Sequence, residues 1–183
     1  MNTAAPGIAG EKAMVVVWDR FVRFFHWTLV ALFAIGYFTG GEVESVHIVN
    51  GYALVALLIL RLLWGFVGPP TARFGSFVKR PAETLAYLRE VGRLRARRYL
   101  GHNPAGAMMI LALMGVLAGT VTTGIMMTTD AYWGAEWVEE AHEFLANTAV
   151  GLIILHVVGV LVASFQHREN LIAAMMTGCK RAD

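Results

Sequence analysis

Four stretches of the chain are each long and apolar enough to cross a lipid bilayer, and they constrain the fold more than any other feature. A helix that spans the hydrocarbon core needs about 20 mostly apolar residues. Such runs cover residues 22–40, 46–67, 104–128 and 138–165. The chain is 57% hydrophobic and only 15% charged, whereas soluble domains are roughly 45–50% apolar. The sequence therefore predicts an all-α membrane protein, a four-transmembrane-helix bundle.

The charged residues outside these runs alternate in sign from one connection to the next. Basic residues dominate both chain ends and the long connection 68–103, while the two remaining connections carry acidic residues and no Lys or Arg. The positive-inside rule then places both termini and the long basic connection in the cytoplasm. The residues that face outward in this topology are Glu42, Glu44, Asp130, Glu136, Glu139, Glu140 and Glu143.

A single domain is expected over residues 18–170, with cytoplasmic tails at 1–17 and 171–183. Residues 1–20 lack the sequence of a basic segment, an apolar segment and small residues that marks a signal peptide, so no cleaved signal peptide is expected. Topology already explains the basic connection, and no nucleic-acid partner is therefore expected. Within that connection, residues 81–92 begin with Pro81 and place Leu at helical spacing, which predicts an amphipathic helix on the inner membrane surface.

The cysteine content excludes several kinds of cofactor site. Cys179 is the single cysteine, so the chain cannot form an internal disulfide or a cysteine-ligated zinc or iron–sulfur site. A Cys-x-x-Cys-His run is also absent, which excludes covalent attachment of a c-type haem.

Four histidines lie within the apolar runs, at two depths. His26 and His156 fall near the inner face, whereas His47 and His142 fall near the outer face. His142 and His156 are 14 residues apart, which places them on similar sides of one helix and about 21 Å apart along its axis. The sequence therefore predicts two opposed pairs, His26 with His156 and His47 with His142.

Facing imidazoles at membrane depth are the arrangement that binds a b-type haem through two axial histidines. Coordination to iron removes the cost of burying an unpaired ring nitrogen. Two imidazoles at each depth are too few ligands for a closed tetrahedral zinc site. Single histidines can also be hydrogen-bonded to a neighbouring helix, and a transporter or metal-binding bundle without haem stays the alternative. We expect two b-type haems, one at each depth.

Two further residues in the second run fit this picture. Gly51 lies one turn after His47 and is expected to leave room for a porphyrin, although small residues also serve ordinary helix packing. Arg61 lies 14 residues after His47, and is expected to pair with an anionic haem propionate. Its alternative is a side chain that extends to the inner interface. His102 and His167 fall outside the runs and are expected at the cytoplasmic surface.

The chain resembles the bacterial cytochrome b561 family, and within it the nickel–iron hydrogenase-type cytochrome b subunits. The segments that carry the resemblance are WDRFVRFFHW, HIVNGYALVALLILRLLWGFVGP, RYLGHNPAGAMM and AHEFLANTAVGLIILHVVGV. The resemblance implies a four-helix bundle in the bacterial inner membrane with two b haems, an inner one on His26 and His156 and an outer one on His47 and His142.

The resemblance also implies a function, namely electron transfer between a quinone pool and a partner such as a periplasmic redox protein. The acidic outer connections suit a basic partner, for example a c-type cytochrome. His102 and Asn103 are candidate quinone contacts near the inner haem, although Asn103 is equally suited to cap a helix. We expect an electron-transfer subunit in contact with membrane lipid, with a homodimer or a companion subunit left open.

A stand-alone superoxide:quinone oxidoreductase is the alternative, because some members of the family resemble such enzymes. An anionic substrate would need a cationic approach to the outer haem, and the outer connections of this chain are acidic. The alternative is therefore ranked second.

Overall fold

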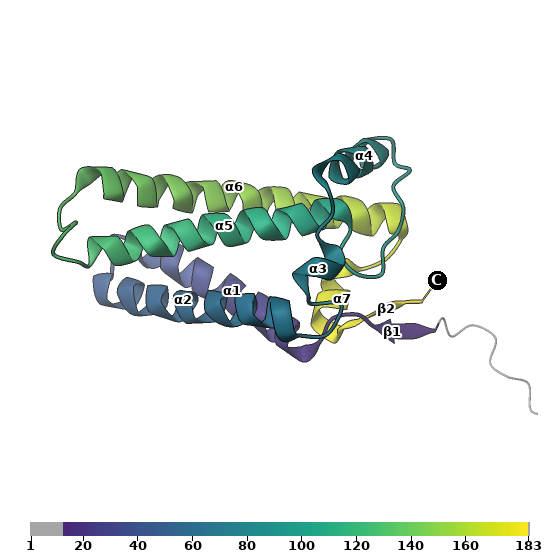
Figure 1. Cartoon of the computed structure of the whole chain (residues 1–183), viewed down its shortest axis with the longest axis horizontal. Coiled ribbons are helices and arrows are strands. Elements are labelled where there is room, and N and C mark those ends of the chain that lie inside the picture. Colours follow the sequence, from purple (N-terminus) through teal and green to yellow (C-terminus); the bar gives the residue numbers. More distant parts are fainter. Residues whose placement is uncertain (1–12, 183) are drawn as a thin grey trace, which may run out of the picture.

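The computed structural model describes residues 13–182, in which four long helices run side by side and shorter elements gather at one end (Figure 1). All four helices are long and apolar enough to span a membrane. The bundle that the sequence predicts is thereby confirmed, and each helix end lies within two residues of its predicted position. The long helices are α1 (Arg20–Thr39), α2 (Glu44–Val67), α5 (Pro104–Met127) and α6 (Glu136–His167).

Local capping explains where two of these helices begin. The Asp19 carboxylate accepts a hydrogen bond of 3.0 Å from the backbone N–H of Val22, and so caps α1. The Asn103 side chain accepts one of 2.7 Å from the N–H of Gly106, directly before Pro104 at the first helical position. Such caps satisfy backbone donors that have no partner within the helix.

The helices pack as two neighbouring pairs, α1 with α2 and α5 with α6, and α2 also contacts α5. A small core of Leu54, Leu58, Leu117 and Ala149 lies between them. Many large apolar side chains point outward instead, with Phe38 at 77% exposure. Exposed apolar surface on this scale is unusual for a soluble monomer, and it suits helices that are surrounded by lipid.

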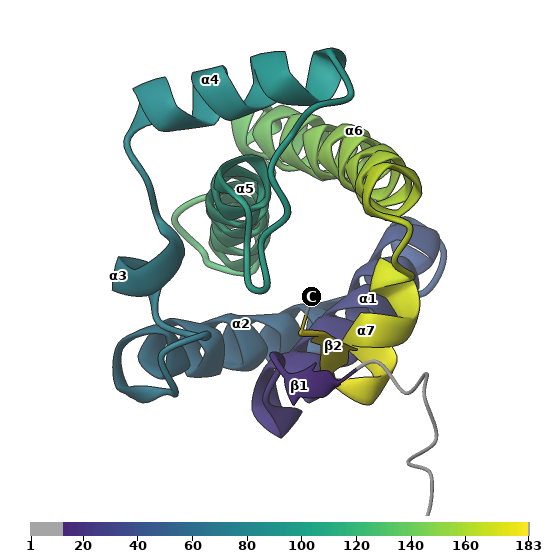
Figure 2. The same cartoon turned by 90° about the vertical axis from the view of Figure 1, so that its right-hand side faces the viewer.

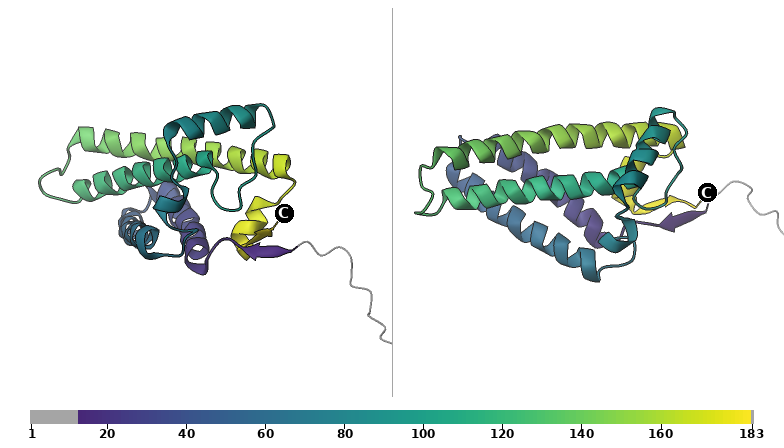
Figure 3. Two further views of the ribbon diagram at one scale, coloured as in Figure 1. Left: turned by 45° about the vertical axis from the view of Figure 1, so that its right-hand side comes forward. Right: turned by 45° about the horizontal axis from the view of Figure 1, so that its top comes forward.

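Five shorter elements gather where α1 begins and α6 ends (Figures 2 and 3). The predicted helix over residues 81–92 is present as α4, and it crosses the ends of α5 and α6 (Figure 2). It buries Tyr87 against the bundle and leaves Leu85 and Leu88 about half exposed. Its location on the membrane surface stays a prediction. The other elements are β1 (Met14–Val16), α3 (Phe74–Phe77), α7 (Leu171–Thr177) and β2 (Cys179–Arg181).

The two described ends of the chain are joined to each other. Strands β1 and β2 pair in antiparallel fashion, although both lie in segments that the sequence assigns to tails. Buried Glu169 forms ion pairs with Arg98 at 2.9 Å and with Lys180 at 3.6 Å. Burial raises the pKa of Glu169, but hydrogen bonds from Arg98 and the Arg181 N–H, with the charge of Lys180, bring it below its usual value.

Both described ends lie at the same end of the bundle (Figure 1), as an even number of membrane crossings requires. This end carries the basic residues of connection 68–103, and the opposite end carries the acidic connections. We call them the basic end and the acidic end. The assignment of the basic end to the cytoplasm stays a prediction.

Candidate functional site

The bundle brings together the two histidine pairs that the sequence predicts. Near the basic end, His26 of α1 faces His156 of α6, with ring centroids 6.5 Å apart. Near the acidic end, His47 of α2 faces His142 of α6, with centroids 6.0 Å apart. Helix α6 thus contributes one ring to each pair, and two different helices contribute the others.

The spacing within each pair matches two imidazoles on opposite sides of one metal ion. With metal–nitrogen bonds of about 2.0 Å and a ring radius of about 1.1 Å, such rings have centroids about 6.2 Å apart. The observed 6.5 and 6.0 Å lie on either side of this value. The ring planes are inclined by 52° and 76°, which excludes parallel face-to-face stacking and is compatible with nitrogen edges that face the gap.

Hydrogen bonds to backbone carbonyls of neighbouring helices fix both rings of the pair near the acidic end. His47 Nδ1 lies 2.9 Å from the carbonyl oxygen of Gly36, and His142 Nδ1 lies 2.9 Å from that of Thr120. A carbonyl oxygen only accepts, so each Nδ1 carries the proton and donates. In the neutral form of each ring the lone pair is then on Nε2, which is the arrangement found in metal-binding histidines.

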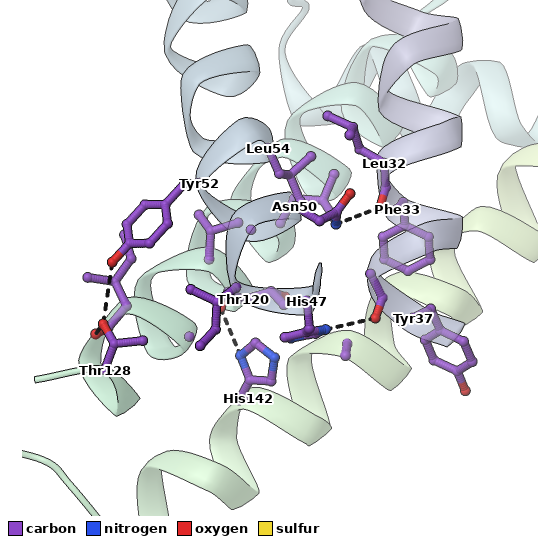
Figure 4. Close-up of a pocket in the computed structure, with 18 residues that line it drawn as sticks. Leu32, Phe33, Tyr37, His47, Asn50, Tyr52, Leu54, Thr120, Thr128 and His142 are labelled. Atoms are coloured by element: carbon purple, nitrogen blue, oxygen red, sulfur yellow. Dashed lines mark hydrogen bonds between the residues drawn. The ribbon is translucent and has the colours of Figure 1, made fainter. Parts of the chain in front are cut away.

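An apolar pocket surrounds this pair and is lined by all four long helices (Figure 4). Gly51 lines it, and a Cβ atom added there would meet no atom within 4 Å. Gly36 lies opposite, where an added Cβ would come within 2.8 Å of the Asn50 amide nitrogen. That amide is buried and donates a 2.9 Å hydrogen bond to the Leu32 carbonyl. The pocket therefore combines space beside Gly51 with closely packed walls.

The other pair has a different polar environment. His26 Nδ1 is buried and has no hydrogen-bond partner among the described residues. Buried polar atoms are nearly always paired in folded proteins. The described residues that contain such an unpaired atom all lie toward the basic end, and they are Asp19, Arg23, His26, Arg61, Trp64, His102 and Arg181.

Arg61 lies inside the protein at the level of this pair. Its side chain is only 3% exposed, between the rings of Phe74 and Phe25 at 5.0 and 5.9 Å. Its Nη2 donates to the Ala72 carbonyl at 3.3 Å, and its Nη1 has no hydrogen-bond partner among the described residues. The Arg61 side chain is therefore enclosed by protein, whereas its proximity to the membrane interface stays untested. The structure leaves one charged donor available to an anionic group.

His102 is enclosed between two aromatic rings and does not lie on an open surface as the sequence suggests. Its centroid lies 4.6 Å from the ring of Trp18 and 4.5 Å from that of Phe77. Burial, together with the positive charges of Arg61 and Lys180, lowers the pKa of His102 to about 3. The ring is therefore neutral at physiological pH, and its buried Nδ1 has no partner among the described residues.

Asn103 follows His102 but serves a structural purpose. Its side-chain oxygen is used by the cap of α5, which confirms the alternative given for this residue. His167, at the end of α6, is partly exposed.

Some features of the site have no clear signal in the sequence. The carbonyl oxygens of Gly36 and Thr120 orient the rings through the backbone, which the sequence pattern cannot reveal. In the sequence Trp64 is one more aromatic residue near a helix end, yet its indole N–H is buried and has no partner among the residues that the structure describes. Asn50 is the exception, because a polar residue three positions after His47 in an apolar run is a visible sequence signal.

The histidine pairs do not form part of a larger cluster of metal-binding side chains. Within residues 13–182, no group of three or more His, Cys, Asp or Glu side chains is arranged to hold a metal ion. A structural zinc site needs four ligands. Two facing imidazoles instead suit a planar cofactor that supplies the remaining ligands of its own metal ion, and beside His47 and His142 the apolar pocket offers space for one.

Comparison with known proteins identifies the family of the chain. The family model of prokaryotic cytochrome b561 matches residues 17–178. A probable Ni/Fe-hydrogenase B-type cytochrome subunit of Rhizobium leguminosarum bv. viciae is 24% identical, over 97% of this chain and 95% of the relative. A protein of the same description from Bradyrhizobium diazoefficiens is 21% identical, over 95% and 90%. No solved structure matches the chain significantly.

The family match covers most of the chain and includes all four paired histidines. The chain therefore belongs to the prokaryotic cytochrome b561 family, whose members are membrane cytochromes that carry haem b and transfer electrons.

Proposed function

We propose that the protein is a di-haem cytochrome b of the bacterial inner membrane, which transfers electrons between a quinone pool and a redox partner outside the cytoplasm. One b haem would be held by His26 and His156 and the other by His47 and His142. The observation that carries this proposal is the pair of imidazole gaps, 6.5 and 6.0 Å between centroids, at two levels of one bundle.

Haem b would supply reversible one-electron chemistry in the membrane. The residues of the chain would supply its position and protonation state. The carbonyls of Gly36 and Thr120 accept hydrogen bonds from Nδ1 in the pair near the acidic end, so that Nε2 would be the atom that binds the haem iron. With two histidines at each level, a bound haem would have no coordination position left for oxygen, which would favour electron transfer over oxygen binding.

Arg61 is the residue proposed to hold a propionate of the haem near the basic end. Its Nη1 is a buried, charged donor without a partner within residues 13–182, and arginine makes strong charge-assisted hydrogen bonds to carboxylates. The buried indole N–H of Trp64, three residues further along α2, is a second donor without a partner in the described part of the chain. An anionic group beside Arg61 would give its Nη1 a partner.

His102 is proposed to contact a quinone near the same haem. A quinone carbonyl needs a hydrogen-bond donor, and His102 is a neutral ring with an unpaired nitrogen between two aromatic rings. Asn103 is the weaker candidate because its side-chain oxygen caps α5.

The acidic end is proposed to receive a basic redox partner, for example a c-type cytochrome. Exposed carboxylates on the outer connections attract a basic protein and repel superoxide, so the superoxide-oxidising alternative stays second. The relatives are described as hydrogenase cytochrome subunits, which makes a membrane-associated redox enzyme another candidate partner.

The first prediction concerns the number of haems. The purified protein should contain two b haems per chain by the pyridine haemochrome assay. Replacing any one of His26, His47, His142 or His156 by Ala should lower the value to about one, because one axial ligand is lost. The control His167→Ala should keep two haems. A wild-type protein with no haem would refute haem binding. A histidine variant that still contains two haems per chain would show that the replaced histidine is not a ligand.

The second prediction concerns Arg61. A nearby positive charge stabilises the reduced haem, so Arg61→Gln should lower the midpoint potential of the haem near the basic end. The expected effect is on the order of 1–2 kcal/mol, the Coulomb energy of unit charges about 10 Å apart at an effective dielectric of about 20.

Redox titration of a variant that retains both haems measures this effect. Arg61→Lys should restore part of the potential, and the exposed Arg73→Gln serves as the control. An unchanged potential in Arg61→Gln would exclude Arg61 from the propionate site.

The third prediction concerns the quinone site. His102→Ala should slow haem reduction by a quinol at least about tenfold, as expected for the loss of a buried hydrogen bond of roughly 1.5 kcal/mol. Reduction by dithionite should be unchanged, because it does not require the quinone site. Stopped-flow absorbance measures both rates, with His167→Ala as the control. Equal slowing by both reductants would indicate general damage and contradict the assignment.

The fourth prediction concerns the partner. Electron transfer from the quinol-reduced protein to a basic c-type cytochrome should slow about tenfold as salt is raised to physiological strength, where the Debye length is about 8 Å. Glu136→Gln with Glu140→Gln should weaken the salt dependence, whereas Glu83→Gln with Glu90→Gln at the basic end should not. A salt-independent rate would refute docking by charge, and rapid haem reduction by superoxide would favour the alternative function.

A further inference from the structure

Helix α1 presents a continuous apolar stripe that no other described element covers. The side chains along it are spaced by three to five positions, and their exposed fractions range from 41% to 77%. In a membrane protein such a stripe faces the lipid acyl chains. Its members are Phe24, Trp27, Val30, Ile35 and Phe38.

Two arginines stand at the end of this stripe that lies in the basic end. Arg20 and Arg23 are one helical turn apart, and with Phe24, Trp27 and Met176 they line a shallow pocket between α1 and α7. Within residues 13–182 the ion pairs all involve Glu169, so neither arginine pairs with a carboxylate there. The pocket therefore contains two arginines that form no ion pair among the described residues, beside the exposed side chains of Phe24 and Trp27.

The pocket is held in place by contacts between α1 and the C-terminal segment. Arg23 donates a hydrogen bond from Nη2 to the carbonyl oxygen of Met176. The backbone N–H groups of Val17 and Trp18 both donate to the Gly178 carbonyl, at 2.8 and 3.0 Å. These contacts fix α7 beside the start of α1, and Arg20 stays exposed at the rim.

We propose that this pocket binds the headgroup of an anionic phospholipid, whose acyl chains lie along the apolar stripe of α1. Basic pockets beside membrane helices on the cytoplasmic side are suited to anionic headgroups. Trp27 follows the two arginines along α1, toward the middle of the membrane. An amphipathic ring is favoured there, at the boundary between headgroups and acyl chains. A free phosphate ion would match the arginines but would gain nothing from the stripe.

A zwitterionic lipid is a poorer match, because its own cation would face Arg20 and Arg23. A second copy of the chain is also disfavoured, because its α1 would bring two more arginines to the same place. Charge and the lipid-facing stripe together select an anionic lipid. The proposal does not depend on which electron donor or acceptor the protein uses.

Native mass spectrometry of the purified haem-containing protein in detergent tests the proposal. Phosphatidylglycerol is titrated against phosphatidylcholine of the same chain length, and inorganic phosphate is added in a separate series. The wild type should retain one phosphatidylglycerol per chain in preference to phosphatidylcholine. Arg20→Gln should weaken this binding roughly fivefold, and Arg20→Gln with Arg23→Gln roughly 25-fold, since each cation near an anionic lipid contributes about this factor.

The exposed pair Lys79→Gln and Arg80→Gln is the matched control, because it removes two charges at the same end without touching the pocket. Arg20→Gln alone guards against misfolding, since Arg23 also anchors α7. Haem content and the midpoint of thermal unfolding should be unchanged in Arg20→Gln. Equal binding of the two lipids, an unaltered affinity in Arg20→Gln, displacement by inorganic phosphate, or an equal loss in the control variant would each overturn the proposal.

Discussion

An imidazole ring inside a bilayer needs a partner for both of its nitrogens, and much of the bundle is arranged around this requirement. In hydrocarbon no water is present to satisfy a polar atom. Near the acidic end, the backbone of α1 satisfies His47 and the backbone of α5 satisfies His142, each through Nδ1. The second nitrogen of each ring is left for the facing gap, where a haem iron is the proposed partner.

Helix α6 makes this arrangement possible at two levels. Its length of 32 residues carries His142 and His156 about four turns apart. Helix α1 supplies the ring that faces His156 near the basic end, and α2 supplies the ring that faces His142 near the acidic end. The close pairing of α5 with α6 fixes the position of α6, and thereby the separation between the two proposed haem sites.

The two ends of the bundle differ in chemistry in a way that suits transfer of electrons across the membrane. The acidic end exposes carboxylates around a well-paired histidine site. The basic end encloses Arg61 and His102, each with a polar atom that has no partner among the described residues. The basic end is thus suited to hold anionic and polar groups, namely the propionates, a quinone and the lipid headgroup that we propose. The acidic end is suited to attract a soluble basic partner.

The sequence by itself determined the helices, their approximate ends and the depth of each histidine, because these follow from local hydropathy and from a constant rise per residue. It also predicted the helix after Pro81 and suggested the cap by Asn103. Tertiary structure decided what surrounds those residues. The enclosure of His102 between Trp18 and Phe77, and of Arg61 between Phe25 and Phe74, joins segments that are distant in the chain. The strand pairing of β1 with β2 depends likewise on residues about 165 positions apart, and no local pattern encodes such contacts.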